Sequence, residues 1–277
     1  MAEFAKMSPE EYREMKQNER NEVFEMLSES TQSLMEKEEL LSYLDLQAEL
    51  FDQTTSNVLL IKAQKPEATW VRTSDEWNKD GVYVSKGEKA INVLTSHPYR
   101  RDDGNMGTAF EVAKVFDISQ TGAKDRPMQK HKYHDVQASI LHRFPCTLEV
   151  TQAVPGGLNA FYDRHQEVIF VKEGMSADET FNALTRELAC YELMRMDYKK
   201  TREDVLPYAE CASYLLAKRY GIAPAEPDCE AIAKSFEGKK EKDVRKDLSD
   251  AKQAAAIIHV KVMEHQKSAR EDRDSER

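Results

Sequence analysis

The sequence predicts an α+β protein with a helical N-terminus, a small and mostly antiparallel sheet domain, and then a second α+β domain with a C-terminal helix. Three observations predict this class. The first residues after Ser8 carry a strong helix-start signal. The middle of the chain alternates short β-branched and aromatic runs with turns. The C-terminal part contains capped segments with helical periodicity.

Composition favours a globular protein of the cytoplasm. Hydrophobic residues make up 40% and charged residues 32% of the 277 residues, and no apolar run reaches the roughly 18–20 residues of a membrane helix. The N-terminus lacks a basic segment followed by an apolar stretch, so we expect no secretory signal and no membrane partner. The four cysteines are scattered without CxxC pairing, which is typical of reduced thiols: Cys146, Cys190, Cys211 and Cys229.

The net charge of −10 is unevenly distributed. Residues 1–50 carry 5 basic and 13 acidic side chains, and residues 146–277 carry 21 and 25. Residues 51–145, with 14 basic and 12 acidic side chains, are the only part that is not acidic, and they hold both tryptophans. This asymmetry points weakly to the middle segment as a place for a polyanion.

Residues 8–52 read as helix. Ser8 is an N-cap, Pro9 suits the first helical position, and Glu10 and Glu11 suit the helix dipole. An apolar stripe begins near Phe24, and we expect a break near residues 28–30. The stripe then resumes at Leu34, Leu40, Leu41, Leu44, Leu46 and Leu50.

The middle segment predicts a sheet. After a short buried element at residues 56–64, β-branched and aromatic runs predict strands near 69–71, 82–84, 90–94 and 110–116. Residues 101–105 are polar and turn-rich, so we expect them to join two longer strands as a hairpin. Residues 119–133 lack periodicity and are interpreted as containing a linker.

The second half predicts a helix near 134–142 and strands near 147–153, 158–162 and 167–171, with a tight turn at 154–157. Ser176 and Glu179 form a capping-box pattern that opens a helix to about residue 196. A second helix runs from about 202 to 219 and ends at Gly221. A third covers roughly 240–266, with apolar residues at Val244, Leu248, Ala251, Ala255, Ile258 and Val262.

The segment from Ala183 to Leu193 resembles the active-site helix of a zinc peptidase without its histidines. Such a helix carries His-Glu-x-x-His, in which two histidines one turn apart bind zinc and the Glu acts on the metal-bound water. Here Arg186 and Cys190 stand at the ligand positions and only Glu187 is kept. Glu210, on the following helix, is the natural candidate for the third ligand.

Two interpretations of these positions follow. Cys190 as thiolate and Glu210 as carboxylate could hold zinc with an unidentified third ligand, which would make an atypical metallopeptidase. Alternatively, Arg186 forms an ion pair with Glu187, Glu210 or both, in the space that a metal would fill. The second interpretation is favoured, because an Arg side chain brings a permanent charge and no lone pair. We therefore expect no metal, no cofactor and no catalytic residue.

Cations and aromatic residues alternate over one stretch of the middle segment. Such interleaving is typical of surfaces that hold single-stranded nucleic acid, where cations follow the phosphates and exposed rings stack on bases. The alternative is that both tryptophans are core residues of the sheet, and spacing alone favours it. The residues concerned are Lys62, Trp70, Arg72, Trp77, Lys79, Tyr83, Lys86 and Lys89.

The order of residues between positions 55 and 121 resembles the N-terminal domain of ArdC-like antirestriction proteins and of the related LtrC-like proteins of conjugative elements. The most specific blocks are Trp-Asn-Lys-Asp-Gly at 77–81, Lys-Gly-Glu-Lys at 86–89 and Phe-Asp-Ile-Ser-Gln-Thr at 116–121. In that family a domain that binds single-stranded DNA precedes a zincin-like metallopeptidase domain. The resemblance covers roughly residues 40–222, and positions 186–190 fall where the family has its metal-binding helix.

We expect five parts: an acidic helical segment at 1–52, a DNA-binding domain at 53–122, a linker at 123–133, a degenerate zincin-like domain at 134–225, and a C-terminal helix with a charged tail at 226–277. The N-terminal helices and the C-terminal helix lie outside the resemblance, which implies the DNA-binding and zincin-like domains. The resemblance also implies a protein of a mobile element that binds single-stranded DNA, with a possible antirestriction role and an inactive peptidase domain. Proteins of a transfer or restriction system are expected as further partners. A non-catalytic interaction protein of the transfer machinery is the remaining alternative.

Overall fold

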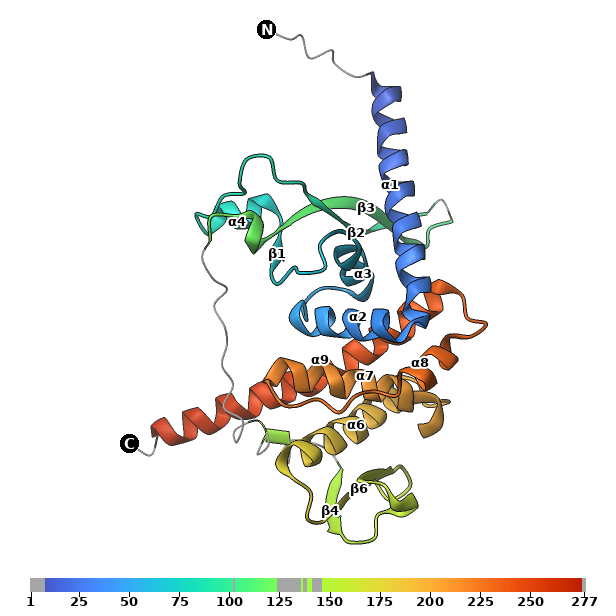
Figure 1. The fold of residues 1–277 in the computed structure, drawn as a ribbon, viewed down its shortest axis with the longest axis vertical. Helices are drawn as coiled ribbons and strands as arrows, with labels where there is room; N and C mark the ends of the chain where they lie inside the picture. Colours follow the sequence, from blue (N-terminus) through green and yellow to red (C-terminus); the bar gives the residue numbers. More distant parts are fainter. Residues whose placement is uncertain (1–7, 102, 124–135, 137–138, 141–145, 276–277) are drawn as a thin grey trace. The chain divides into compact units, whose positions relative to one another are not determined.

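The computed structural model describes residues 8–101, 103–123, 136, 139–140 and 146–275, with side chains up to residue 268. The chain forms two compact units (Figure 1). Unit 1 contains Met1–Leu34 and Asp52–Arg126, and unit 2 contains Met35–Phe51 and Pro127–Arg277. Both units combine helices with a small sheet, so the predicted α+β class is confirmed. In the described part of the chain no helix is both long and apolar enough to cross a membrane.

Unit 1 is a three-stranded antiparallel sheet, of order β1-β3-β2, with helices α1, α3 and α4. The predicted start of α1 is confirmed, because Ser8 and Glu11 form a reciprocal capping box. The predicted break near residues 28–30 is wrong. The Thr31 hydroxyl donates to the Leu27 carbonyl inside the helix, and the chain leaves α1 only at Ser33. The bounds are α1 Pro9–Gln32, α3 Thr55–Gln64, α4 Ser74–Lys79, β1 Val71–Arg72, β2 Ile91–Arg100 and β3 Met106–Asp117.

Helix α3 is bound to the outer edge of β2 by two side-chain amides. Asn57 donates to the Leu94 carbonyl and accepts from the Leu94 amide, at 3.1 and 2.9 Å. Gln64 does the same with Asn92, at 2.9 Å in both directions. The two amides are seven residues apart, which is two helical turns, so both lie on one side of α3. They satisfy backbone groups that an edge strand otherwise leaves unpaired.

Asp117 organises the centre of unit 1. Its Oδ1 accepts the backbone amides of Thr69 and Trp70, at 2.8 and 2.9 Å, and its Oδ2 accepts that of Ser119 at 3.0 Å. The Asp117 amide in turn donates to Gln120, which also binds the carbonyl of Lys89. The carboxylate thereby joins the end of β3 to the approach to β1, and Gln120 joins it to the approach to β2.

Two local expectations in unit 1 are corrected. Residues 82–84 are not a strand, and only Val84 forms an isolated bridge, with Thr121. Helix α4 forms instead just upstream, where no element was predicted. Thr73 and Glu76 make a full capping box there, and the Trp77 ring anchors the short helix by its burial. The capping pattern outweighs the β propensity of the segment.

Unit 2 contains a mixed sheet of order β4-β6-β5, in which β4 is parallel and β5 antiparallel to β6. Helices α6, α7 and α9 pack on one another, and α2 packs on α7 and α8 (Figure 1). The bounds are α2 Lys37–Glu49, β4 Thr147–Thr151, β5 Ala160–Asp163, β6 Val168–Lys172, α6 Ala177–Met196, α7 Arg202–Tyr220, α8 Cys229–Phe236 and α9 Glu241–Ser275.

The predicted strands and the helices α6 and α7 are confirmed within a few residues. Ser176 and Glu179 cap α6 as expected, and Gly221 ends α7 with a φ of +68°, where a side chain would be strained. Helix α9 is longer than predicted, and α8 was not predicted. The predicted linker at 123–133 lies outside the described residues except for its first position. Of the helix expected at 134–142, only residues 136, 139 and 140 are described, and they are helical.

We expect Asp117→Asn to destabilise unit 1 by about 1–3 kcal/mol, because it removes a charged acceptor from buried amide donors. Burial alone would raise the pKa of the Asp117 carboxyl, but hydrogen bonds from Ser119, Trp70 and Thr69 hold it below its ordinary value. The ionised group therefore stabilises the fold above about pH 4, and this contribution disappears as the pH falls through the folded-state pKa.

Urea denaturation followed by tryptophan fluorescence measures this effect, since both tryptophans lie in unit 1. Glu111→Gln is the matched control, because its carboxylate is 73% exposed on β3. Equal midpoints for the two variants, or an Asp117→Asn effect that persists unchanged at pH 3, would contradict the assigned role.

Candidate functional site

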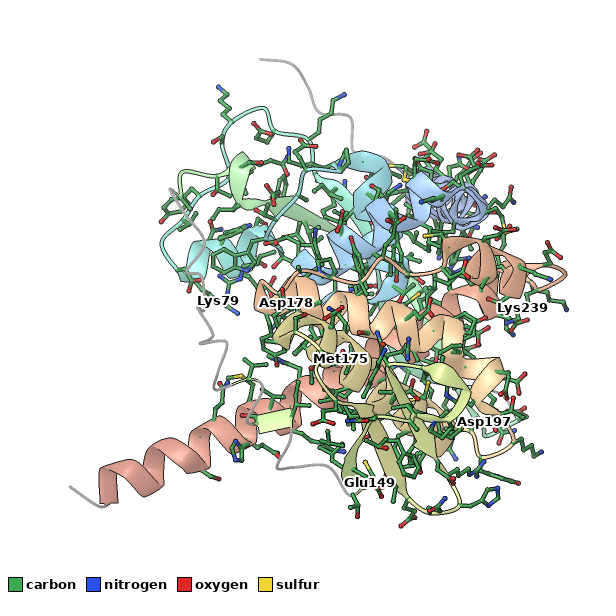
Figure 2. The ribbon with its side chains drawn as sticks, turned by 60° about the horizontal axis from the view of Figure 1, so that its bottom comes forward. Lys79, Glu149, Met175, Asp178, Asp197 and Lys239 are labelled. Atoms are coloured by element: carbon green, nitrogen blue, oxygen red, sulfur yellow. The ribbon has the colours of Figure 1, made fainter. Side chains whose placement is uncertain are left out.

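The helix with the peptidase-like pattern is α6, in unit 2. Its N-terminal end is marked by Met175 and Asp178 and its C-terminal cap by Asp197 (Figure 2). Glu187 and Cys190 are fully buried in the middle of α6, whereas Arg186 retains 23% of its side-chain exposure. The predicted ligand positions therefore lie in two different environments.

Glu187 is a fully buried carboxylate with four donors. Arg202, the first residue of α7, donates Nη2 to Oε1 at 2.7 Å and Nε to Oε2 at 3.2 Å. The Nε of Arg186 donates to Oε1 at 3.1 Å, and the Tyr162 amide donates to Oε2 at 3.0 Å. Of the predicted alternatives for Arg186, the structure shows the ion pair with Glu187. Burial alone would lower the pKa of Arg202, but the bond with Glu187 raises it.

The side chains of Glu187 and Arg186 also bind the edge strand of the sheet in unit 2. Strand β5 is an outer strand, and its Tyr162 amide binds Glu187 while its Ala160 carbonyl accepts from Arg186 at 3.4 Å. The Arg186–Glu187 pair thus satisfies backbone groups on the edge of β5, and Arg202 links the pair to α7. In this arrangement each oxygen of Glu187 accepts two hydrogen bonds from the protein.

The residues of this site do not fit a divalent cation. Arg186 has no lone pair to offer, and both oxygens of Glu187 are taken by guanidinium groups. Burial raises the pKa of the Cys190 thiol, whereas a metal needs the thiolate. No three His, Cys, Asp or Glu side chains among the described residues converge on a possible metal position.

Glu210 makes a different contact from the one predicted. Its Oε2 accepts the Asp228 amide at 2.8 Å, at the end of an extended segment, residues 222–228, that follows α7. Asn182 of α6 holds the middle of this segment, donating to the Ala223 carbonyl and accepting from the Ala225 amide. A pocket of about 350 Å³ remains between this segment and α6, with Arg186 and Glu210 in its lining.

The predicted DNA-binding residues lie in unit 1, and three of them form one cluster. The Trp70 and Trp77 rings meet edge to face at 4.9 Å, and the Arg72 guanidinium lies 5.1 and 5.4 Å from their centroids. Arg72 also pairs with Asp80. Lys62 is carried by a separate element, α3, on a side of that helix different from Asn57 and Gln64.

Trp77 cannot stack on a base in this structure. Its side chain is 1% exposed, and its indole Nε1 donates to the Phe116 carbonyl at 2.9 Å. Of the two interpretations left open by the sequence, the core interpretation holds for Trp77, while Trp70 is half-buried. Tyr83, at 68% exposed, is the ring in this segment that is available to a ligand.

Three lysines near Tyr83 are exposed. Lys79 ends α4 (Figure 2), and Lys86 and Lys89 follow in the loop before β2. None of the three makes an ion pair within the described part of the chain. Neighbouring acids are engaged elsewhere: Glu67 with Lys65, Asp80 with Arg72, Glu76 with Thr73 and Glu88 with Gln120.

Sequence reasoning missed three groups that shape these sites. Arg202 gave no signal, because its contact with Glu187 crosses from one helix to the next. No sequence pattern pointed to Asn182 or to the 222–228 segment either. Asp117 and Gln120 could have been found, since Asp-Ile-Ser-Gln places an acid and an amide at capping-box spacing.

Comparisons with known proteins match both units. Residues 14–138 match the N-terminal domain of the anti-restriction factor ArdC. The uncharacterized protein pXO2-81 of Bacillus anthracis is 22% identical over 336 residues, covering 97% of this chain and 56% of the relative. The chain therefore spans about half the length of the curated relative that it matches.

Two crystal structures of the antirestriction ArdC protein from plasmid R388 share the fold. The metal-free structure has a TM-score of 0.54 at 17% identity and covers 76% of this chain and 85% of its own. The Mn(II)-bound structure has a TM-score of 0.53 at 16% identity, with 75% and 84% covered. Residues 14–138 thus match the N-terminal domain of ArdC, and the chain shares an α+β fold with the ArdC structures.

Proposed function

We propose that the protein binds single-stranded DNA through unit 1, in the service of a mobile element and of antirestriction. The observation that carries the proposal is the match of residues 14–138 to the ArdC N-terminal domain. The domain that we propose as responsible spans residues 53–122. Its candidate contact surface, called the lysine loop below, consists of Lys79, Tyr83, Lys86 and Lys89.

The lysine loop has the chemistry that single strands require. Three exposed ammonium groups that have no acidic partner among the described residues can follow a phosphate backbone, and the Tyr83 ring offers a face to a base. Two turns with glycine at positive φ, at Gly81 and Gly87, give the loop its course. Bonds from Gln120 to the Lys89 carbonyl and from Ser85 to the Gln120 carbonyl attach it to the fold.

We further propose that residues 134–225 form a metal-free domain without peptidase activity. The support is the Arg186–Glu187–Arg202 cluster, which fills the position of a general base with an ion pair. A peptidase that uses Cys190, Glu210 and a third ligand would need the thiolate of a fully buried cysteine and a carboxylate that now binds a backbone amide.

Replacing Lys79, Lys86 and Lys89 together by Ala should weaken binding to a single-stranded oligonucleotide and flatten its salt dependence. Each lost phosphate contact lowers the slope of log K against log salt by about 0.7, so three contacts lower it by about 2. Fluorescence anisotropy titrations at several salt concentrations measure both quantities, with duplex DNA run in parallel.

The matched control carries Lys199, Lys234 and Lys240 replaced by Ala, which removes the same charge from exposed positions of unit 2. We expect it to keep the wild-type slope. If the wild-type chain binds no oligonucleotide at low salt, the DNA proposal fails and an interaction role in a transfer system becomes the better account.

Protein purified without chelators should contain zinc and manganese far below stoichiometric amounts, and calorimetric titration with either ion should show no saturable site. The reason is the donor set, in which two guanidinium groups hold the one acid of the pattern. Elemental analysis by mass spectrometry measures the content. Stoichiometric metal would overturn the metal-free assignment and revive the peptidase.

Arg202→Met should destabilise unit 2 by about 3–5 kcal/mol, since it leaves the buried Glu187 carboxylate with a single, partly exposed cation. Far-ultraviolet circular dichroism during urea denaturation follows this unit, and tryptophan fluorescence follows unit 1 as an internal reference. Lys199→Met, at an exposed position, is the control. A wild-type-like transition for Arg202→Met would show that Glu187 does not depend on Arg202.

A further inference from the structure

The hairpin formed by β2 and β3 extends well past the core of unit 1. Ile91 and Val93 are buried at its inner end, but the side chains of β2 from Thr95 to Arg100 are all exposed. In Figure 1 the turn of this hairpin emerges on the opposite side of α1 from α4. Three large exposed side chains lie on this outer part: Tyr99, Met106 and Phe110, at 45, 64 and 42%.

The register of the hairpin separates two faces. Tyr99 pairs with Gly107, and His97 pairs with Ala109, so these four residues share one face. Arg100 and Phe110 lie on the other face, because side chains alternate along a strand. The Tyr99 face therefore has a large aromatic ring opposite a residue without a side chain.

Gly107 makes room for two side chains at once. A Cβ at this position would lie 2.6 Å from Cε1 of Tyr99 and 2.9 Å from Nε of Arg101. The Tyr99 ring and the Arg101 guanidinium thus lie together over the bare backbone of Gly107. The Tyr99 side chain is 45% exposed in this position, and the Arg101 guanidinium lies on the same backbone.

The charges on this face favour an anionic, aromatic ligand at its outer end. Arg101 makes no side-chain ion pair within the described residues. The acids nearby have contacts of their own: Glu111 lies 3.9 Å from His97, and Asp103 accepts the Asn105 amide within the turn. An aromatic face next to an uncommitted guanidinium suits a base with its phosphate.

We propose that the Tyr99–Arg101 face of the hairpin is a second contact surface for single-stranded DNA, where Tyr99 stacks on a base and Arg101 binds a phosphate. This inference rests on the proposed function of unit 1. Strand β2 begins two residues after Lys89, and Tyr99 lies eight strand steps, or ~26 Å, beyond its first residue. At ~3.4 Å per stacked nucleotide this distance corresponds to about eight nucleotides, within the ~4–16 that single-strand binding domains cover.

Affinity measurements on two faces of one hairpin test the proposal. Tyr99→Ala and Arg101→Ala should each weaken binding of a twenty-nucleotide single strand roughly tenfold, and Tyr99→Phe should bind like the wild type, because the ring is kept. Gly107→Val should weaken binding comparably, since its side chain displaces Tyr99 and Arg101 while leaving both present. Phe110→Ala and Arg100→Ala, on the opposite face, are the controls and should keep wild-type affinity.

Cross-linking locates the contact independently of affinity. An oligonucleotide with 5-iododeoxyuridine at successive positions is irradiated with the full-length protein, and the linked peptides are identified by mass spectrometry. Cross-links to Tyr99 are expected, in addition to links near Tyr83. Fluorescence melting of each variant confirms that unit 1 remains folded.

The outcomes separate this inference from the function on which it rests. Wild-type protein that binds the oligonucleotide, with unchanged affinity for Tyr99→Ala and Arg101→Ala and no link to Tyr99, would overturn the hairpin surface and leave the lysine loop in place. Equal losses for variants of both faces would also overturn it. Wild-type protein without any binding would overturn both proposals.

Discussion

The interaction on which unit 2 depends is the neutralisation of one buried carboxylate. Glu187 has no exposed surface, and an ionised acid in such a place is tolerated only when cations and hydrogen-bond donors surround it. Arg202, Arg186 and the Tyr162 amide meet that requirement, and they come from the start of α7, from α6 and from β5. One charge thereby fixes the relative placement of two helices and a sheet edge.

The same constraint shows which groups balance the charge of Glu187 in unit 2. In a metal site the bound cation would attract its ligand side chains and so hold together the helices and strands that carry them. Here the guanidinium groups of Arg186 and Arg202 supply the positive charge beside Glu187. The similarity in fold to ArdC from plasmid R388, which has been seen with Mn(II), is compatible with an altered donor set in this chain. The part of the chain for which we propose ligand binding is the one that matches the ArdC N-terminal domain, residues 14–138.

Local signals in the sequence were sufficient for much of the fold, because capping boxes and terminal glycines act through neighbouring residues. Ser176 begins α6 and Gly221 ends α7 as anticipated. Helix α4 was missed although it has such a signal. Thr73 and Glu76 form its capping box within a segment of strand-like composition. The partners of Glu187 were anticipated only in part, because Arg202 approaches from another helix. The burial of Trp77 likewise depends on packing, which residue spacing does not specify.

The side-chain amides of α3 affect how unit 1 can associate with other molecules. An edge strand with unpaired backbone groups is a template on which a strand from another molecule can add, and chains often aggregate in this way. Asn57 and Gln64 occupy those groups at Leu94 and Asn92, so the inner half of β2 is closed to such addition. The two amides thereby oppose polymerisation by strand addition at the part of the sheet where apolar residues are most concentrated.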